Sequence, residues 1–156
     1  MVQQGFGHNV NTASLAGLSP SPMELSYVTS KYGVVGLSTA LRGEAKDLGV
    51  RVSVVCPGLI DTPIAQAMGV RGMDREQLVT LFRSAKPTTP DACARVILRG
   101  VEKNKAIIVV TGLAHVIWYL TRLSPNLALR FWGRMFLRPF RALRQGDANK
   151  GVSNAG

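Results

Sequence analysis

Hydrophobic positions along this chain alternate between short β-branched runs and longer stretches with helical spacing. The run from Val50 to Cys56 is rich in valine and stops at a Pro-Gly pair, which predicts a buried strand. Residues 7–13 and 106–110 predict two more strands. Residues 23–48 contain no proline and are followed by Gly49, a pattern typical of a helix with a C-terminal glycine.

Two shorter helices are predicted between the second and third strands. Asp74 can cap a helix that reaches Ser84, and Pro90 can open another that reaches Val101. The expected order is therefore strand, helix, strand, helix, helix, strand. Helices of this length between strands favour parallel pairing with right-handed crossovers, so we expect an α/β fold around a parallel sheet.

The C-terminal residues 113–156 are predicted to form a basic, mostly helical tail that is disordered at its end. Ser124 and Pro125 suit a helix cap and first turn, and Pro139 should kink or end the helix. The arginines at 130, 134, 138, 141 and 144 share one helical face. The other face carries mainly apolar side chains, namely Phe131, Trp132, Met135, Phe136, Phe140 and Leu143.

Charge is concentrated in this tail. The formal net charge is +10, and residues 1–112 hold 12 Lys and Arg against 8 Asp and Glu, whereas residues 113–156 hold 7 against 1. A localised excess of this kind is typical of a solvated face or of contact with an anionic membrane surface, and we do not expect nucleic acid binding. The apolar run at 106–120 is shorter than the roughly 20 residues of a membrane span, and it predicts a strand followed by a helix start.

Several classes of site are disfavoured by the residues present. Cys56 and Cys93 form no Cys-x-x-Cys pair and no signal-peptide pattern precedes them, which indicates free thiols in a reducing, cytoplasmic setting. His8 and His115 have no Cys, Asp or Glu at ligand spacing, so we expect no metal site. The sequence has no Gly-x-Ser-x-Gly motif, which argues against a serine hydrolase.

Residues with possible catalytic roles follow the first and second predicted strands. Tyr27 and Lys31 are four residues apart in the predicted helix, so they share a face, and the ammonium favours the ionised form of the phenol. This spacing alone also fits a solvated pair on a helix surface. Ser14 lies 13 residues before Tyr27, where it can equally cap a turn. After the second strand, Pro57-Gly58 can simply end the strand, and Thr62 can start a helix.

Together these motifs resemble the short-chain dehydrogenase/reductase family, whose pattern has a Ser after a strand, Tyr-x-x-x-Lys about thirteen residues later, and Pro-Gly-x-x-x-Thr after the next strand. The resemblance covers roughly residues 5–112. It implies a partial Rossmann-type, doubly wound parallel sheet over residues 1–112, the catalytic part, followed by the tail at 113–156. It also implies an NAD(P)-dependent oxidoreductase that transfers a hydride between a nicotinamide cofactor, NAD or NADP, and an alcohol or ketone.

The resemblance implies a role for each matched residue. Tyr27 would be the general acid/base, Ser14 would hydrogen-bond the reacting oxygen, and Lys31 would assist the tyrosine and hold the nicotinamide ribose. Pro57, Gly58 and the backbone near Ile60 would surround the nicotinamide, and Thr62 would contact its carboxamide or the diphosphate. The helix that carries Tyr27 would form a homo-oligomer contact, where Gly33, Gly36 and Ala40 allow close approach.

One part of the family pattern is missing from this sequence. No glycine-rich turn that would bind a pyrophosphate precedes Ser14. We therefore expect the chain to be the C-terminal part of a longer protein and to be inactive alone. The alternative is a non-catalytic basic module whose tail helix binds an anionic membrane surface or a partner protein. A cytoplasmic dehydrogenase with peripheral membrane contact would combine both properties.

Overall fold

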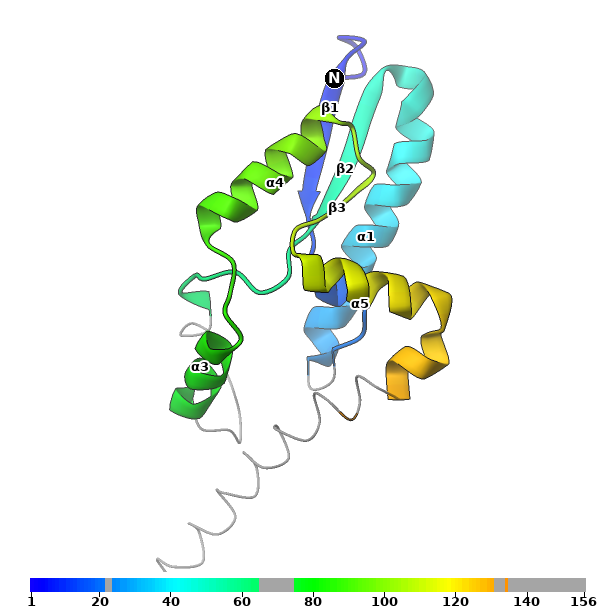
Figure 1. The fold of residues 1–156 in the computed structure, drawn as a ribbon. Helices are drawn as coiled ribbons and strands as arrows, with labels where there is room; N and C mark the ends of the chain where they lie inside the picture. Colours follow the sequence, from blue (N-terminus) through cyan, green and yellow to red (C-terminus); the bar gives the residue numbers. More distant parts are fainter. Residues whose placement is uncertain (22–23, 65–74, 131–133, 135–156) are drawn as a thin grey trace, which may run out of the picture.

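A three-stranded parallel β-sheet forms the centre of the computed structural model of this chain (Figure 1). The structure describes residues 1–21, 24–64, 75–130 and 134. The strands are β1 (Gly7–Thr12), β2 (Val50–Cys56) and β3 (Ile107–Val109), and β2 lies between the other two. Gly7 pairs with Val50 at one end of the β1–β2 ladder, and Cys56 pairs with Val109 at the end of the β2–β3 ladder. The predicted α/β class and parallel sheet are confirmed.

The helices follow the predicted order. α1 (Leu25–Ala45) connects β1 to β2, α3 (Arg75–Ser84) and α4 (Pro90–Glu102) connect β2 to β3, and α5 (Gly112–Leu123) follows β3. Short 3-10 turns occupy Leu15–Gly17 (η1) and Lys46–Leu48 (η2). Gly49 ends η2 with a φ of 71°, a left-handed conformation that glycine adopts without steric cost. Asp74, the predicted cap of α3, lies outside the described residues.

Some boundaries differ from the prediction by a few residues. The helix predicted over 23–48 is α-helical only to Ala45 and then tightens into η2. The strand predicted over 106–110 pairs only from Ile107 to Val109. Both differences fall at element ends, where sequence patterns are least decisive.

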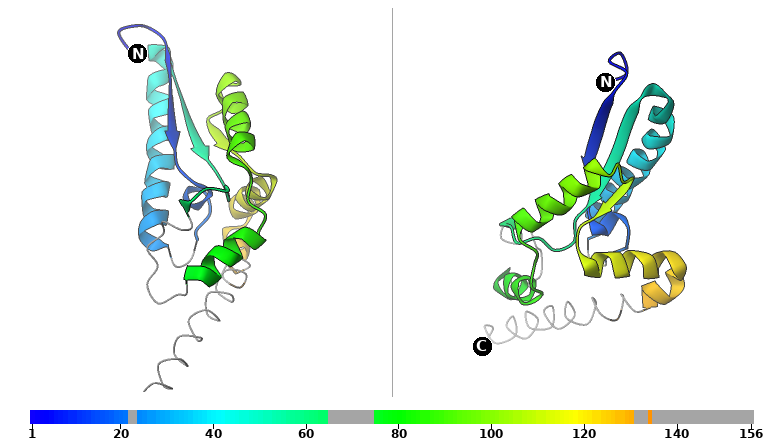
Figure 2. Two further views of the ribbon diagram at one scale, coloured as in Figure 1. Left: turned by 90° about the vertical axis from the view of Figure 1, so that its left-hand side faces the viewer. Right: turned by 45° about the horizontal axis from the view of Figure 1, so that its top comes forward.

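Side chains of β2 alternate between two apolar layers, because successive residues of a strand point to opposite faces. Val54 and Cys56 pack against Val34 and Val35 on the side of α1. Val55 packs instead with Cys93, Ile108 and Val110, and with Val96 and Ile97 of α4, on the other side. Figure 2 shows the sheet between α1 and α4. The buried centre of the fold is therefore β2, which lies between the two apolar layers.

α5 packs near the carboxyl ends of the strands (Figure 1). Ile117 of α5 and Ala128 of the helical residues 125–130 form a buried cluster with Leu15, and Thr121 Oγ1 donates to Ser19 Oγ at 3.3 Å. The predicted arginine face at 138, 141 and 144, and the aromatic residues opposite it, lie outside the described residues. Within the described ranges, no helix has the length and hydrophobicity needed to cross a bilayer.

Candidate functional site

The carboxyl ends of β1, β2 and β3 meet at one edge of the sheet, because the three strands are parallel. In open α/β sheets this edge is where ligands bind. The predicted site residues leave the sheet here: Ser14 lies two residues after β1, and Pro57 and Gly58 directly follow β2. The chain also passes from β3 into α5 at this edge, through Thr111.

Ser14 is held by backbone contacts to the end of β2. Ala13 donates its N–H to the Val55 carbonyl at 2.8 Å, and Leu15 donates its N–H to the Pro57 carbonyl at 2.8 Å. Ser14 itself has an extended backbone, with φ −167° and ψ 164°, and it caps η1. Its Oγ accepts the N–H of Ala16 at 3.2 Å. The hydroxyl hydrogen of Ser14 is therefore still able to donate to a bound group.

Tyr27 and Lys31 lie in the first two turns of α1, on the same face. The Lys31 Nζ is 5.5 Å from the centroid of the Tyr27 ring, within the range of a cation–π contact. The same Nζ lies 3.5 Å from the Thr12 carbonyl oxygen at the end of β1. The Tyr27 side chain is 39% exposed, so its phenol is open to a ligand. The ammonium is thus close to both the phenol and the β1 end.

Gly17 brings the Ser14 loop directly against this turn of α1. A Cβ atom at Gly17 would lie 2.5 Å from the Lys31 carbonyl oxygen and 2.9 Å from Cγ2 of Val35. Only glycine allows this approach without movement of one of the two backbones. Ser14 is therefore flanked by two contacts to Lys31, one through Thr12 and one through Gly17. In this way the structure brings the Ser14 segment together with Tyr27 and Lys31.

The loop after β2 is fixed at two points. Gly58 lies against the start of α5, where an added Cβ would be 2.8 Å from Thr111 Oγ1. Ile60 forms a parallel bridge with Thr88, whose N–H donates to the Leu59 carbonyl at 3.0 Å. Thr62 is exposed near the end of the described segment 24–64. Pro57, Gly58 and Ile60 thus stay beside the sheet edge, while Thr62 lies further along the loop.

Two groups near the site are poorly suited to proton transfer. Burial raises the pKa of the Cys56 thiol to about 12, although a hydrogen bond from the Ser14 backbone opposes the shift. Cys56 therefore stays a neutral thiol at physiological pH. Partial burial also raises the pKa of Tyr32, which follows Lys31 in α1. Tyr27 is thus the better placed of these two tyrosines for acid–base chemistry, because its phenol lies beside Lys31.

Three positioning residues were not identified from the sequence. Gly17 and Thr111 act through contacts between segments that are distant in the chain, which no local pattern reports. Asn11 donates from Nδ2 to the buried Ser38 Oγ at 3.0 Å and so ties β1 to α1. The contact of Thr111 with Gly58 could not be predicted, but its role as a helix cap could, since Thr before Gly-Leu-Ala suits a helix N-terminus. Its Oγ1 accepts the Ala114 N–H at 3.1 Å.

Among the described residues, no three His, Cys, Asp or Glu side chains are grouped closely enough to hold a metal ion. The arrangement instead offers a hydroxyl, a phenol and an ammonium beside a glycine-containing loop. Such groups can hydrogen-bond a polar oxygen and exchange a proton with it.

Comparison with known proteins shows which family this chain resembles. The family model described as "short chain dehydrogenase" matches residues 1–71. A probable oxidoreductase, EphD, of Mycobacterium tuberculosis is 32% identical over 144 residues, which cover 86% of this chain and 24% of that protein. The D-beta-hydroxybutyrate dehydrogenase of Rhizobium meliloti is 31% identical over 120 residues, which cover 77% of this chain and 43% of that protein.

A solved structure shows the same fold. A short-chain dehydrogenase/reductase from Burkholderia phymatum, crystallised in complex with NAD, aligns with a TM-score of 0.67 and 25% identity over 81% of this chain and 51% of that one. This chain therefore spans about half or less of the length of the proteins that it matches.

Proposed function

Because this chain belongs to the short-chain dehydrogenase/reductase family, we propose that its site transfers a hydride between a nicotinamide cofactor, NAD or NADP, and an alcohol or ketone. The observation that carries the proposal is the docking of the Ser14 loop on the Tyr27–Lys31 turn at the carboxyl edge of the sheet. The similarity to a hydroxybutyrate dehydrogenase and to an NAD-bound structure supports this choice of substrate class and cofactor.

The groups present fit the nicotinamide end of such a cofactor. The bound cofactor supplies the hydride, so the protein has to hold and orient it and to manage a proton. The Lys31 ammonium has three donors, of which one points to the Thr12 carbonyl, and the others are available to ribose hydroxyls and to the tyrosine. Gly58 packs closely on Thr111 and so holds the start of the loop after β2, which would border the nicotinamide of a bound cofactor.

Tyr27 acts as the general acid/base in this proposal. In the reducing direction its hydroxyl donates a proton to the carbonyl oxygen, and in the oxidising direction the phenolate removes the proton from the alcohol. The Lys31 ammonium lies 5.5 Å from the centroid of the Tyr27 ring, close enough for a cation–π contact. Exposure of the Tyr27 side chain leaves room for the substrate oxygen beside it.

Ser14 orients the same substrate oxygen. Its Oγ already accepts the Ala16 N–H, and this bond orients the hydroxyl group. The hydroxyl can then donate its hydrogen to an oxygen that gains negative charge. The backbone bonds from Ala13 and Leu15 to the end of β2 fix the loop before the substrate arrives. We assign Pro57, Gly58 and the Ile60 backbone to the nicotinamide surroundings, and Thr62 to its carboxamide or diphosphate.

We also propose that the outer face of α1 forms a homo-oligomer contact. An added Cβ at Gly33 or Gly36 would meet nothing within 4 Å, so another helix can approach this face closely. Leu37 directly follows Gly36 and is 64% exposed. Burial of such a leucine against a second copy would stabilise the association by roughly 1.5–3 kcal/mol at each position.

Turnover by two matched tyrosine variants tests the proposal. The assay uses the protein encoded by the longest reading frame that contains this chain, with NADH or NADPH and a panel of ketones. Tyr27→Phe should lower kcat by at least about a hundredfold while cofactor affinity changes little, because only the proton-transfer group is removed. Tyr32→Phe on the same helix should leave turnover nearly unchanged. Turnover that survives in Tyr27→Phe, or no NAD(P)-linked turnover with any ketone, contradicts the proposal.

A further inference from the structure

α5 exposes an unusually apolar surface for a helix at the edge of a small domain. Leu113, Val116, Tyr119, Leu120 and Leu123 are all exposed, and Leu123 reaches 82%. At about 100° per residue these five side chains occupy one arc of about 120°. The buried residues of α5, Ala114 and Ile117, lie outside this arc, and Ile117 packs with Leu15. The apolar arc therefore points away from the fold and is unpartnered among the described residues.

The helical residues 125–130, which follow α5, extend this surface into a groove. The groove has a volume of about 880 Å³ and lies between the end of α5 and the helical residues 125–130. Four aliphatic side chains, Ser124 and two arginines line it; the lining residues are Leu120, Leu123, Ser124, Leu127, Ala128, Arg130 and Arg134. Ser14, Tyr27 and Lys31 do not line it, so this groove is not the site described above.

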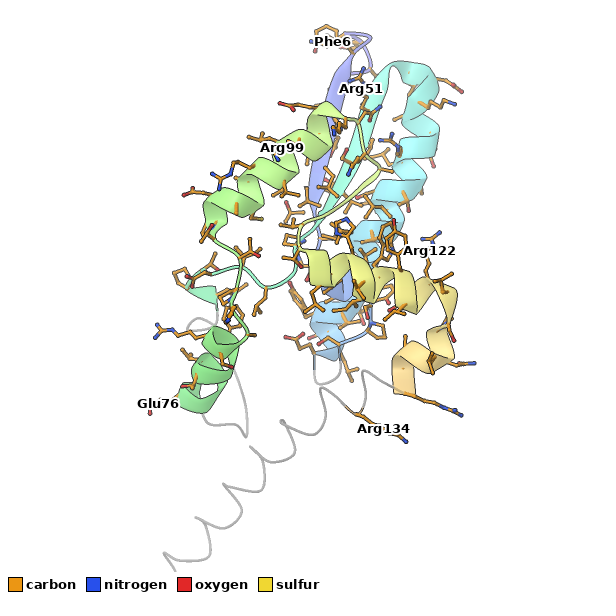
Figure 3. The ribbon with its side chains drawn as sticks, in the orientation of Figure 1. Phe6, Arg51, Glu76, Arg99, Arg122 and Arg134 are labelled. Atoms are coloured by element: carbon orange, nitrogen blue, oxygen red, sulfur yellow. The ribbon has the colours of Figure 1, made fainter. Side chains whose placement is uncertain are left out.

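The chain segment that forms this apolar surface carries positive charge and no acidic residue. The sequence has no Asp or Glu between Glu102 and Asp147, while the same segment contains eight Lys and Arg. Among the described residues, Arg130 and Arg134 line the groove. Arg122 lies beside the apolar arc, with its guanidinium 6.0 Å from the centroid of the Trp118 ring. Figure 3 shows Arg122 and Arg134 at the α5 end of the molecule, far from Arg51 and Arg99.

An anionic lipid surface matches this combination better than a second protein copy does. The whole chain has a net charge of +10, so two copies facing each other through this surface would bring like charges together. A membrane interface instead accepts leucines and a tyrosine into the boundary of the acyl chains, while arginines contact the lipid phosphates. α5 has 12 residues and is about 18 Å long, which suits a helix that lies along the surface.

We propose that the face formed by α5, residues 124–130 and Arg134, hereafter the α5 face, docks onto the surface of an anionic lipid bilayer. Leu113, Leu123 and Leu127 enter the interface, and Arg122, Arg130 and Arg134 contact phosphate groups. The inference rests on the described side chains of this face and does not depend on the proposed oxidoreductase activity.

Sedimentation with lipid vesicles tests the docking. The protein is mixed with vesicles of phosphatidylcholine containing phosphatidylglycerol, and with pure phosphatidylcholine vesicles, at low and high salt. We expect binding to the anionic vesicles at low salt, much weaker binding at high salt, and little binding to the neutral vesicles. No binding to anionic vesicles at low salt, or equal binding to neutral vesicles, overturns the proposal.

Matched variants locate the binding surface. The triple variant Arg122→Gln, Arg130→Gln, Arg134→Gln should weaken binding about a hundredfold, since each arginine near an anionic surface contributes about fivefold. The control triple variant Arg51→Gln, Arg95→Gln, Arg99→Gln removes the same charge from exposed positions elsewhere and should change binding much less. Equal weakening by the two triple variants would show a general charge effect and overturn the assignment to the α5 face.

Two double variants test the apolar side of the α5 face. Leu113→Gln with Leu123→Gln changes this face, and Leu48→Gln with Leu98→Gln is the control at exposed leucines elsewhere. Only the first pair should reduce vesicle binding. The oligomeric state of each variant is measured by light scattering. If Leu113→Gln with Leu123→Gln dissociates a dimer and leaves vesicle binding unchanged, the α5 face is a contact between copies and the proposal fails.

Discussion

Replacing Gly17 with alanine tests how closely the Ser14 loop is held against α1. The new methyl group would lie 2.5 Å from the Lys31 carbonyl oxygen, whereas ordinary contact begins at 3.4 Å, so the two backbones must separate by about 0.9 Å. Overpacking of this kind costs about 1–3 kcal/mol of folding free energy. A shift of about 1 Å at a reacting group can lower the rate about a hundredfold. We expect Gly17→Ala to lower both the free energy of unfolding in urea and kcat/KM.

Gly43→Ala is the matched control. Gly43 lies near the other end of α1, and an added Cβ there meets nothing within 4 Å. Alanine in an exposed helix interior should therefore stabilise the chain by about 0.5–1 kcal/mol and leave kcat/KM unchanged. If Gly17→Ala unfolds at the same urea concentration as the parent, the close packing of the Ser14 loop on Lys31 is wrong.

Burial lowers the pKa of His8 below its ordinary value of 6.5, so protonation favours the unfolded chain and stability should fall as pH drops below 6.5. Urea titrations between pH 7.5 and 5 should show a shallower fall for His8→Gln, and equal slopes would refute this. With its pKa near 12, Cys56 should resist iodoacetamide at pH 8 in the folded chain and react in urea, which mass spectrometry can follow; prompt labelling of the folded chain would show that the thiol is not buried. Thr111→Ala removes the cap on the Ala114 N–H and should cost about 1 kcal/mol by urea unfolding, whereas Thr111→Ser should restore most of it.

Most of the fold could be predicted from the sequence because its signals are local. The valine-rich run of β2 stops at Pro57, the left-handed turn after η2 uses Gly49, and Pro90 stands at the first position of α4. Each of these features depends on residues that are neighbours in the chain. The order of elements then follows, and the parallel pairing follows from the helices between the strands.

The contacts that assemble the site could not be predicted in the same way. Gly17 meets Lys31 only because η1 folds back on α1, and Gly58 meets Thr111 across 53 positions of sequence. Arg42 of α1 similarly donates to the Asn104 side chain at 3.0 Å, across 62 positions. Such contacts depend on how helices pack on the sheet, and a glycine in a loop looks alike in sequence whether or not another backbone approaches it.

The α5 face shows a different limit. The excess of positive charge at the C-terminal end was predicted from the sequence, and the apolar residues opposite the arginines were expected at 131–143, which lie outside the described residues apart from Arg134. The structure adds exposed apolar residues of α5 from Leu113 onward, because the buried side of α5 is set by its packing near Leu15. Helical spacing gives the faces of a helix, whereas tertiary packing decides which face is buried.

Hydride transfer at the Tyr27 site is tested most directly by following an isotope. The protein encoded by the longest reading frame that contains this chain is incubated with a panel of ketones and with NADH or NADPH that carries deuterium at C4 of the nicotinamide. The product is examined by NMR. We expect deuterium on the carbinol carbon with the parent protein, and at least about a hundredfold slower transfer with Tyr27→Phe at similar cofactor occupancy. Cofactor binding without transfer to any ketone, or equal transfer by Tyr27→Phe, would contradict it.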